Sequence, residues 1–209
     1  VCAYLDEAVK LSQDLAEHPE LPYEEYESSR KMAAILGHAG FHVTYPYAGY
    51  DTAFCAEFDN GDGPSVAFLA EYDALPEIGH GCGHNLHGSL SVLSGLAMHH
   101  LKDEFQGKIY VIGTPAEEEN GAKIGMAEQG IFDQMDMAVM MHSNPGGFCV
   151  ADMDVLSLRC YVVEFFGETA HAVMAPWDGK SALAAGRKFL DLIDARRECF
   201  TPDIHVNAV

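Results

Sequence analysis

The sequence predicts an α/β fold in which helices cover a central, largely parallel sheet, because buried strands alternate with amphipathic helices. Continuous apolar runs at 66–70, 109–112 and 138–141 are typical of strands that are buried on both faces. Between the first two runs, apolar residues recur every three or four positions, which is the pattern of one buried helix face. They are Leu86, Leu90, Leu93, Ala97 and Leu101.

The N-terminal part is expected to add two helices and two strands to this core. Loose helical spacing of apolar residues predicts helices over 4–17 and 24–38. A short strand is expected at 41–45, and 52–59 alternates apolar and other residues as a half-buried strand does. A further helix is expected at 121–130, which would separate the second and third buried strands.

The pattern changes near Asp152, so we expect one domain over 1–152 and a smaller, incomplete α+β unit over 153–209. Three elements are expected in the second unit, namely strands at 155–167 and 203–209 and a helix at 181–199. The last of these strands has neither a partner nor a closing turn. We therefore expect the chain to be the N-terminal portion of a longer unit.

Charge and composition exclude some classes of partner. The chain has 32 acidic and 12 basic side chains and a formal charge of -20, which repels nucleic acid and anionic membranes. It contains no apolar run long enough to cross a bilayer and no recognisable signal peptide. Six scattered cysteines in a chain with its own core indicate reduced thiols and a cytoplasmic protein.

Polar residues that can bind metal follow each of the three buried strands. The first strand runs into Asp73, the second into Glu117 and Glu118, and the third ends at His142. The stretch "GHGCGHNLHG" at 79–88 comes between the first strand and a helix. Because ligands bind outside the carboxyl ends of the strands in open α/β sheets, these segments are expected to meet at one edge.

The residue types at this edge suit a divalent ion such as zinc, which takes thiolate, imidazole and carboxylate ligands. One glycine separates Cys82 from His84, and the other ligands lie far along the chain, which is typical of a catalytic site and unlike a zinc finger. In "PAEEE", one carboxylate can bind metal while its neighbour takes a proton from metal-activated water.

Each feature also has a simpler interpretation. The three glutamates could favour the N-terminus of the following helix through its dipole. Taken alone, Cys82 could be a small buried residue and His142 a hydrogen-bonded core histidine. His80 and His87 are interpreted as supporting or ordinary loop residues.

Four motifs resemble the metal-dependent amidohydrolases of the aminoacylase and carboxypeptidase superfamily. They are "AEYDALPEIGHGCGHNLHG", "GTPAEEENGAK", "MMHSNP" and "GETAHAVMAPWDGKSAL", found here in the order of that family. The branch that they resemble holds hippurate hydrolases, auxin-conjugate amidohydrolases and aminobenzoyl-glutamate hydrolase. The resemblance implies an enzyme that cleaves an N-acyl or peptide-like amide next to a free carboxylate.

The resemblance also implies site residues and two divalent ions, for which zinc, manganese and cobalt are candidates. The implied metal ligands are Cys82, His84, Glu118 and His142. Glu117 is implied as the general base, and Asp73 as a carboxylate that supports the site. His171 is implied to hold the substrate carboxylate or the oxyanion from a lid domain, the region through which such enzymes form homodimers.

Two departures from the family pattern stand out. Asn85 occupies a position where many relatives have Asp, which removes a carboxylate beside the ligands. The family also has a further metal-binding histidine beyond the lid, outside the 209 residues. A non-catalytic metal-binding or dimerisation protein is therefore an alternative, and thiol redox chemistry at Cys82 is a weaker one because no second cysteine is nearby in sequence.

Overall fold

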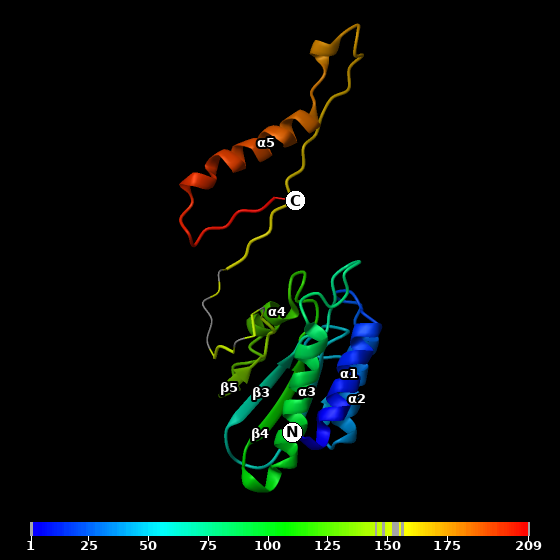
Figure 1. The fold of residues 1–209 in the computed structure, drawn as a ribbon, viewed down its shortest axis with the longest axis vertical. Helices are drawn as coiled ribbons and strands as arrows, with labels where there is room; N and C mark the ends of the chain where they lie inside the picture. The colour runs from blue at the N-terminus through cyan, green and yellow to red at the C-terminus, as the bar shows by residue number, and fades with distance from the viewer. Residues whose placement is uncertain (1, 145, 148, 152–154, 156, 209) are drawn as a thin grey trace. The chain divides into compact units, whose positions relative to one another are not determined.

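The computed structural model describes residues 2–144, 146–147, 149–151, 155 and 157–208. It divides the chain into two compact units, residues 1–148 and 149–209. The domain boundary expected at residues 152 and 153 lies outside the described residues. The first unit contains a sheet with helices, and the second contains a long helix (Figure 1).

The first unit is built on a five-stranded sheet in the order β1-β2-β4-β3-β5. Its strands are β1 (His42–Thr44), β2 (Phe54–Asp59), β3 (Ser65–Ala70), β4 (Lys108–Gly113) and β5 (Met137–Val139). The three strands expected from continuous apolar runs, β3, β4 and β5, are parallel. β2 runs antiparallel to both β1 and β4, so the sheet is mixed. The predicted α/β class is confirmed.

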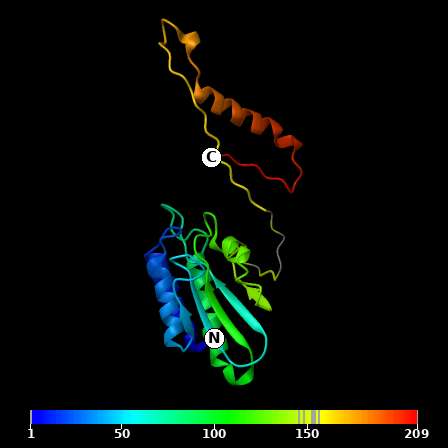
Figure 2. The same cartoon turned by 180° about the vertical axis from the view of Figure 1, so that it is seen from behind.

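Helices cover both faces of this sheet, as Figures 1 and 2 show from opposite sides. On one face, α1 (Leu5–Glu17), α2 (Tyr26–His38) and α3 (His84–His100) enclose the larger hydrophobic core. On the other face, α4 (Ala122–Glu128) buries Ala122 and Met126 in a smaller core. Short 3-10 turns occupy Cys2–Tyr4 and Lys102–Glu104.

The expected inner face of α3 is wrong. Of the five positions predicted to face the core, only Leu93 is buried, and Leu86 and Leu101 are about half exposed. The buried side instead combines Val92, Leu93 and Leu96 with small and polar residues, because α3 lies very close to the sheet. A Cβ at Gly88 would lie 2.5 Å from the carbonyl oxygen of Glu71, and one at Gly95 only 2.4 Å from Val111 Cγ2.

The second unit contains the predicted helix, as α5 (Ala182–Arg196), with short 3-10 turns at Pro176–Asp178 and Arg197–Cys199. The Ser181 hydroxyl caps α5 by accepting the Ala184 N–H. The strands expected at 155–167 and 203–209 are absent from the described parts of those segments. No neighbouring strand pairs with them there, and Val162 is 92% exposed. Without a partner, an alternating apolar segment has no ladder to join.

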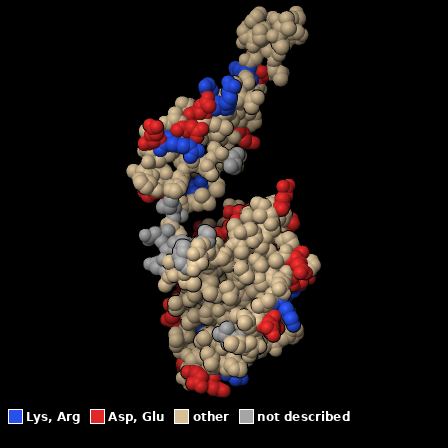
Figure 3. Space-filling view, in the orientation of Figure 1, with Lys and Arg blue, Asp and Glu red and all other residues tan. Residues whose placement is uncertain are grey.

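The acidic composition is visible on the surface. Figure 3 shows acidic side chains along the margins of the first unit, with few basic ones among them. Along α5 of the second unit the two signs alternate, with ion pairs such as Lys188–Asp191. Among the described residues, no helix is long and apolar enough to span a membrane.

Candidate metal centre

The three parallel strands end at the same edge of the sheet, and chemically active side chains follow each of them. Glu71 and Asp73 follow β3, Glu117 and Glu118 follow β4, and His142 follows β5. The N-terminus of α3 brings His84 to the same place. The structure thus brings together side chains from four segments that are far apart in sequence.

His84 lies at the centre of this group. Its ring is fully buried, and its Nδ1 lies 2.9 Å from Asp73 Oδ1, so the Nδ1–H donates to that carboxylate. This contact leaves the Nε2 lone pair free to bind a cation. Nε2 is buried and has no hydrogen-bonding partner among the residues that the structure describes. Carboxylate oxygens of Glu71, Glu117 and Glu118 lie 3.6, 3.7 and 3.9 Å from it.

The clustered carboxylates make this edge strongly negative. Burial lowers the pKa of His84, but the hydrogen bond to Asp73 and the charges of Glu71 and Glu118 outweigh it and raise the pKa. Hydrogen bonding to Glu118, together with burial and nearby acids, raises the pKa of Cys82 to about 11. The field that favours a protonated ring and thiol also favours a bound divalent cation.

Two sets of ligand atoms in the described residues could each hold a cation, since the atoms of each lie within 4.8 Å of one another. The sets are Glu71, His84, His87 and His142, and His84, Glu117 and Glu118. Imidazole and carboxylate donors fit zinc or manganese. The unpaired, buried Nε2 of His84 supports this fit, because an orphaned polar atom in a protein interior is costly.

Glu117 and Glu118 differ in their surroundings. The Glu117 side chain is 42% exposed, whereas that of Glu118 is 16% exposed. Glu118 also contacts Cys82, and its backbone N–H donates to Asp73 Oδ2 at 2.9 Å. Neither residue lies in the first turn of α4, which contains no acidic side chain. The helix-dipole interpretation of "EEE" therefore has no support in the structure.

Glu71 and His87 were not among the predicted ligands, but both lie in the first ligand set. His87 Nε2 accepts the Ser143 N–H at 2.8 Å, and its Nδ1 lies 3.4 Å from Glu71 Oε2. Glu71 also forms an ion pair with Lys123. The sequence contains a signal for both residues: Glu71 is two positions from Asp73, and His87 is one helical turn beyond His84.

The remaining predicted residues lie at different distances from this group. Cys82 lies outside both ligand sets among the described residues, although its thiol contacts Glu118. The exposed His142 ring lies 4.3 Å from the His87 ring, measured between centroids. His171 belongs to the second unit, where its Nδ1 accepts backbone N–H groups of Val173 and Met174. Its Nε2 therefore carries the hydrogen and can donate it.

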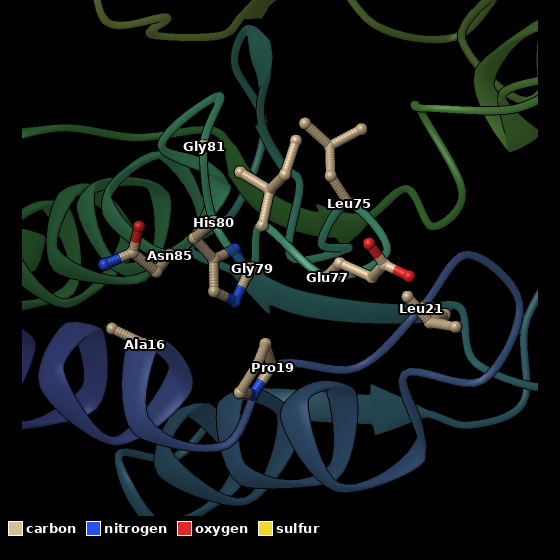
Figure 4. Close-up of a pocket in the computed structure, with 10 residues that line it drawn as sticks. Ala16, Pro19, Leu21, Leu75, Glu77, Gly79, His80, Gly81 and Asn85 are labelled. Carbon is tan, nitrogen blue, oxygen red and sulfur yellow. The ribbon is translucent and has the colours of Figure 1, made fainter.

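A hollow of about 580 Å³ lies on one side of the loop that leads to His84 (Figure 4). Its lining includes Pro19, Leu75, Glu77, His80 and Asn85. Burial lowers the pKa of His80, which favours its neutral form. Asn85 donates to the backbone carbonyl of Ser12 and so ties the start of α3 to α1.

Comparison with known proteins identifies relatives over most of the chain. A model of peptidase family M20/M25/M40 matches residues 67–196. The Xaa-Arg dipeptidase of Mus musculus is 33% identical over 98% of this chain and 51% of its own length. A p-aminobenzoyl-glutamate hydrolase subunit from Escherichia coli (strain K12) is 30% identical over 87% of this chain and 43% of its own length.

Among solved structures, a dinuclear metal binding peptidase of family M20 from Bacillus subtilis matches with a TM-score of 0.61 and 27% identity. The match covers 68% of this chain and 44% of that protein. The chain spans about half the length of the curated relatives it matches.

Proposed function

The chain belongs to peptidase family M20/M25/M40, as its motifs implied, and on that premise we propose that it forms part of a dinuclear metal amidohydrolase. The proposed reaction is hydrolysis of an N-acyl amino acid, an aminobenzoyl-glutamate-like conjugate or a dipeptide at the amide next to a free carboxylate. The observation that carries the proposal is the buried, unpaired His84 Nε2 facing three carboxylates at the carboxyl ends of parallel strands.

Cys82, His84, Glu118 and His142 are the proposed metal ligands. Glu71 and His87 lie close enough to this group to support it. Divalent ions held there would supply the positive charge that polarises an amide carbonyl and lowers the pKa of a nearby water. We propose zinc or manganese as the resident ions, with cobalt as a further candidate.

Glu117 is the proposed general base. Its exposed carboxylate is within reach of water, whereas the neighbouring Glu118 is held by Asp73 and Cys82. In this role Glu117 takes a proton from the attacking water and delivers it to the nitrogen of the leaving amine. Asp73 keeps the His84 ring in the orientation that presents Nε2 to the site.

His171 is proposed to bind the substrate carboxylate or the developing oxyanion. Backbone N–H groups donate to its Nδ1, so the ring offers an Nε2–H donor to an anionic group. The relatives include a dipeptidase and an aminobenzoyl-glutamate hydrolase, and both kinds of substrate have a carboxylate near the scissile amide.

Assembly and location are parts of the same proposal. We expect a homodimer formed through the second unit, where Leu158, Val162 and Phe166 are each more than 80% exposed. Six cysteines without a disulfide among the described residues are typical of a cytoplasmic protein.

The alternative is a protein that keeps the metal site and the dimerisation surface but has no hydrolytic activity. Redox chemistry at Cys82 has less support, because Cys55, the nearest cysteine in the sequence, is 27 positions away.

An amidase assay distinguishes these functions. Acyl-amino acids, aminobenzoyl-glutamate and dipeptides are offered to the protein with added zinc or manganese and after treatment with a chelator. We expect hydrolysis that requires added metal. Tight metal binding with no hydrolysis of any of the three classes would favour the non-catalytic alternative.

A further inference from the structure

Glu25 is a buried carboxylate at the start of α2 that takes no part in the metal centre. It is 0% exposed, and each of its oxygens accepts a hydrogen bond. Oε1 accepts the backbone N–H of Ala116 at 2.8 Å, and Oε2 accepts the Thr52 hydroxyl at 2.8 Å. The first of these bonds connects residues 91 positions apart in sequence and reaches the segment that contains Glu117.

Ala116 has a backbone conformation that needs support from its surroundings. Its φ is +60°, in the left-handed region that residues with a Cβ rarely adopt. Its own carbonyl accepts the N–H of Gly121 at 2.9 Å, which closes a turn around the glutamates. An unfavourable conformation of this kind persists only where neighbouring groups hold it in place.

The two functional glutamates are anchored on both sides. The Ala116 N–H is held by Glu25, and the Glu118 N–H is held by Asp73 at 2.9 Å. Glu117 lies between these two anchored backbone groups. Its own side chain has little to restrain it, because it is 42% exposed, so its direction depends on the backbone that carries it.

The anchor at Glu25 is itself rigid. Thr52, its second partner, is 1% exposed, and the Thr52 carbonyl accepts the hydroxyl of the fully buried Tyr72 at 2.7 Å. Ser29 donates its hydroxyl to the Glu25 carbonyl at 2.7 Å. Hydrogen bonds therefore hold both Thr52, which binds the Glu25 carboxylate, and the backbone of Glu25 itself.

We propose that Glu25 is a positioning residue that holds Ala116 in its left-handed conformation and thereby directs the Glu117 carboxylate toward the metal centre. This inference rests on the proposed function, in which Glu117 is the general base. Glu25 itself touches neither substrate nor metal. It affects the reaction through the backbone of residues 115–119.

The test compares Glu25→Ala, Glu25→Gln and Thr52→Val with the matched control Glu24→Ala, in the metal-loaded protein. Glu24 is the exposed neighbour of Glu25, so its change tests for effects of a lost surface charge. The readouts are kcat and KM for amide hydrolysis, bound metal by elemental analysis, and hydrogen exchange of the peptide covering 114–121. Glutamine keeps an oxygen that can accept the Ala116 N–H, whereas alanine does not.

For Glu25→Ala we expect kcat to fall about tenfold or more, because a displaced catalytic group is costly. We expect KM and bound metal to stay within about twofold, and exchange in 114–121 to rise about tenfold with the loss of a charge-assisted hydrogen bond. Glu25→Gln should restore kcat and protection to within about threefold. Glu24→Ala should match the wild-type protein in every readout.

The proposal is overturned if Glu25→Ala leaves both kcat and exchange in 114–121 unchanged, or if Glu25→Gln is as impaired as Glu25→Ala. If Glu25→Ala does not fold, Thr52→Val and Glu25→Gln decide the question. The proposal is supported if hydrogen exchange becomes faster only in 114–121 of Thr52→Val while Glu25→Gln keeps its protection there. It is contradicted if Thr52→Val shows no change in the exchange of 114–121. If the metal-loaded wild type hydrolyses none of the substrates, the proposed function is contradicted. Hydrogen exchange in 114–121 of the variants then still tests whether Glu25 holds the backbone of Ala116.

Discussion

Glu117 and Glu118 are adjacent residues with different environments, which is the basis for giving them different roles. We expect Glu117→Gln to reduce kcat by about 10²- to 10⁴-fold, the range that a general base typically contributes. Bound metal should stay close to the wild-type amount, because the proposed ligand is Glu118. Steady-state kinetics and elemental analysis measure the two quantities.

Glu119→Gln is the matched control, since Glu119 is an exposed member of the same acidic run. The general-base assignment is wrong if Glu117→Gln retains activity within a few-fold of the wild type, or if Glu119→Gln causes an equal loss.

Glu25 also leads to a prediction on pH-dependent stability. Burial raises the pKa of Glu25 above its ordinary value, so the folded state binds the proton more tightly than the unfolded state. Folding is then progressively disfavoured as pH rises from the unfolded-state pKa through the higher folded-state pKa. Because glutamine has no proton to lose, Glu25→Gln should gain stability relative to the wild type as pH rises through that window.

Urea unfolding of both proteins at pH values between about 4 and 8 measures this difference. A difference in unfolding free energy that is independent of pH would show that Glu25 has the same pKa in both states.

The sequence predicts which residues at the ends of strands belong to the site. It does not predict which residues from distant segments contact one another. The sequence places His84, Glu117, Glu118 and His142 at one edge, because the carboxyl ends of parallel strands meet there. Lys123 approaches Glu71 from α4, and Ala116 approaches Glu25 from the segment after β4. Neither pairing follows from spacing along the chain, so the sequence does not predict Lys123 as the partner of Glu71 or Ala116 as the partner of Glu25.

At the scale of elements, helix α3 shows where periodicity misleads. Leucine spacing predicted an inner face that is largely exposed, because the helix lies too close to the sheet for leucines at most of the buried positions. Glycine allows that approach at the expense of helix propensity. The strands predicted in the second unit are absent from its described residues for a related reason. Alternating apolar residues indicate a segment that can join a sheet, but a strand forms only where a second strand pairs with it.

Because α3 packs closely against the sheet, a substitution that raises its helix propensity is expected to lower the stability of the protein. Gly95→Ala should gain about 1 kcal/mol in helix propensity. The new Cβ would lie 2.4 Å from the buried Val111 side chain, and overpacking of that kind costs about 1–3 kcal/mol. We therefore expect a net loss of stability, measured as a lower urea midpoint.

Ser94→Ala is the neighbouring control, because the Ser94 hydroxyl donates to the Leu90 carbonyl one turn earlier in the same helix. It should leave the midpoint unchanged or raise it slightly. Equal or greater stability of Gly95→Ala would contradict the packing described between α3 and the sheet.

At the scale of the whole molecule, the proposed ligands belong to the first unit, residues 1–148, whereas α5 and His171 belong to the second. A cation that binds only the folded state stabilises the unit that holds it. We expect added zinc to slow hydrogen exchange in β3, β4 and α3 and to leave exchange in α5 unchanged. Equal protection of α5 would indicate that zinc binds elsewhere or acts on both units.

The buried His84 Nε2 and the surrounding carboxylates are proposed to hold divalent metal. Elemental analysis of the protein after incubation with zinc or manganese and exhaustive dialysis tests this proposal most directly. The comparison uses the wild type, His84→Ala and the control His38→Ala, whose histidine is exposed at the end of α2. We predict stoichiometric metal in the wild type and in His38→Ala and a large loss in His84→Ala. Unchanged metal content in His84→Ala would show that His84 does not hold the metal.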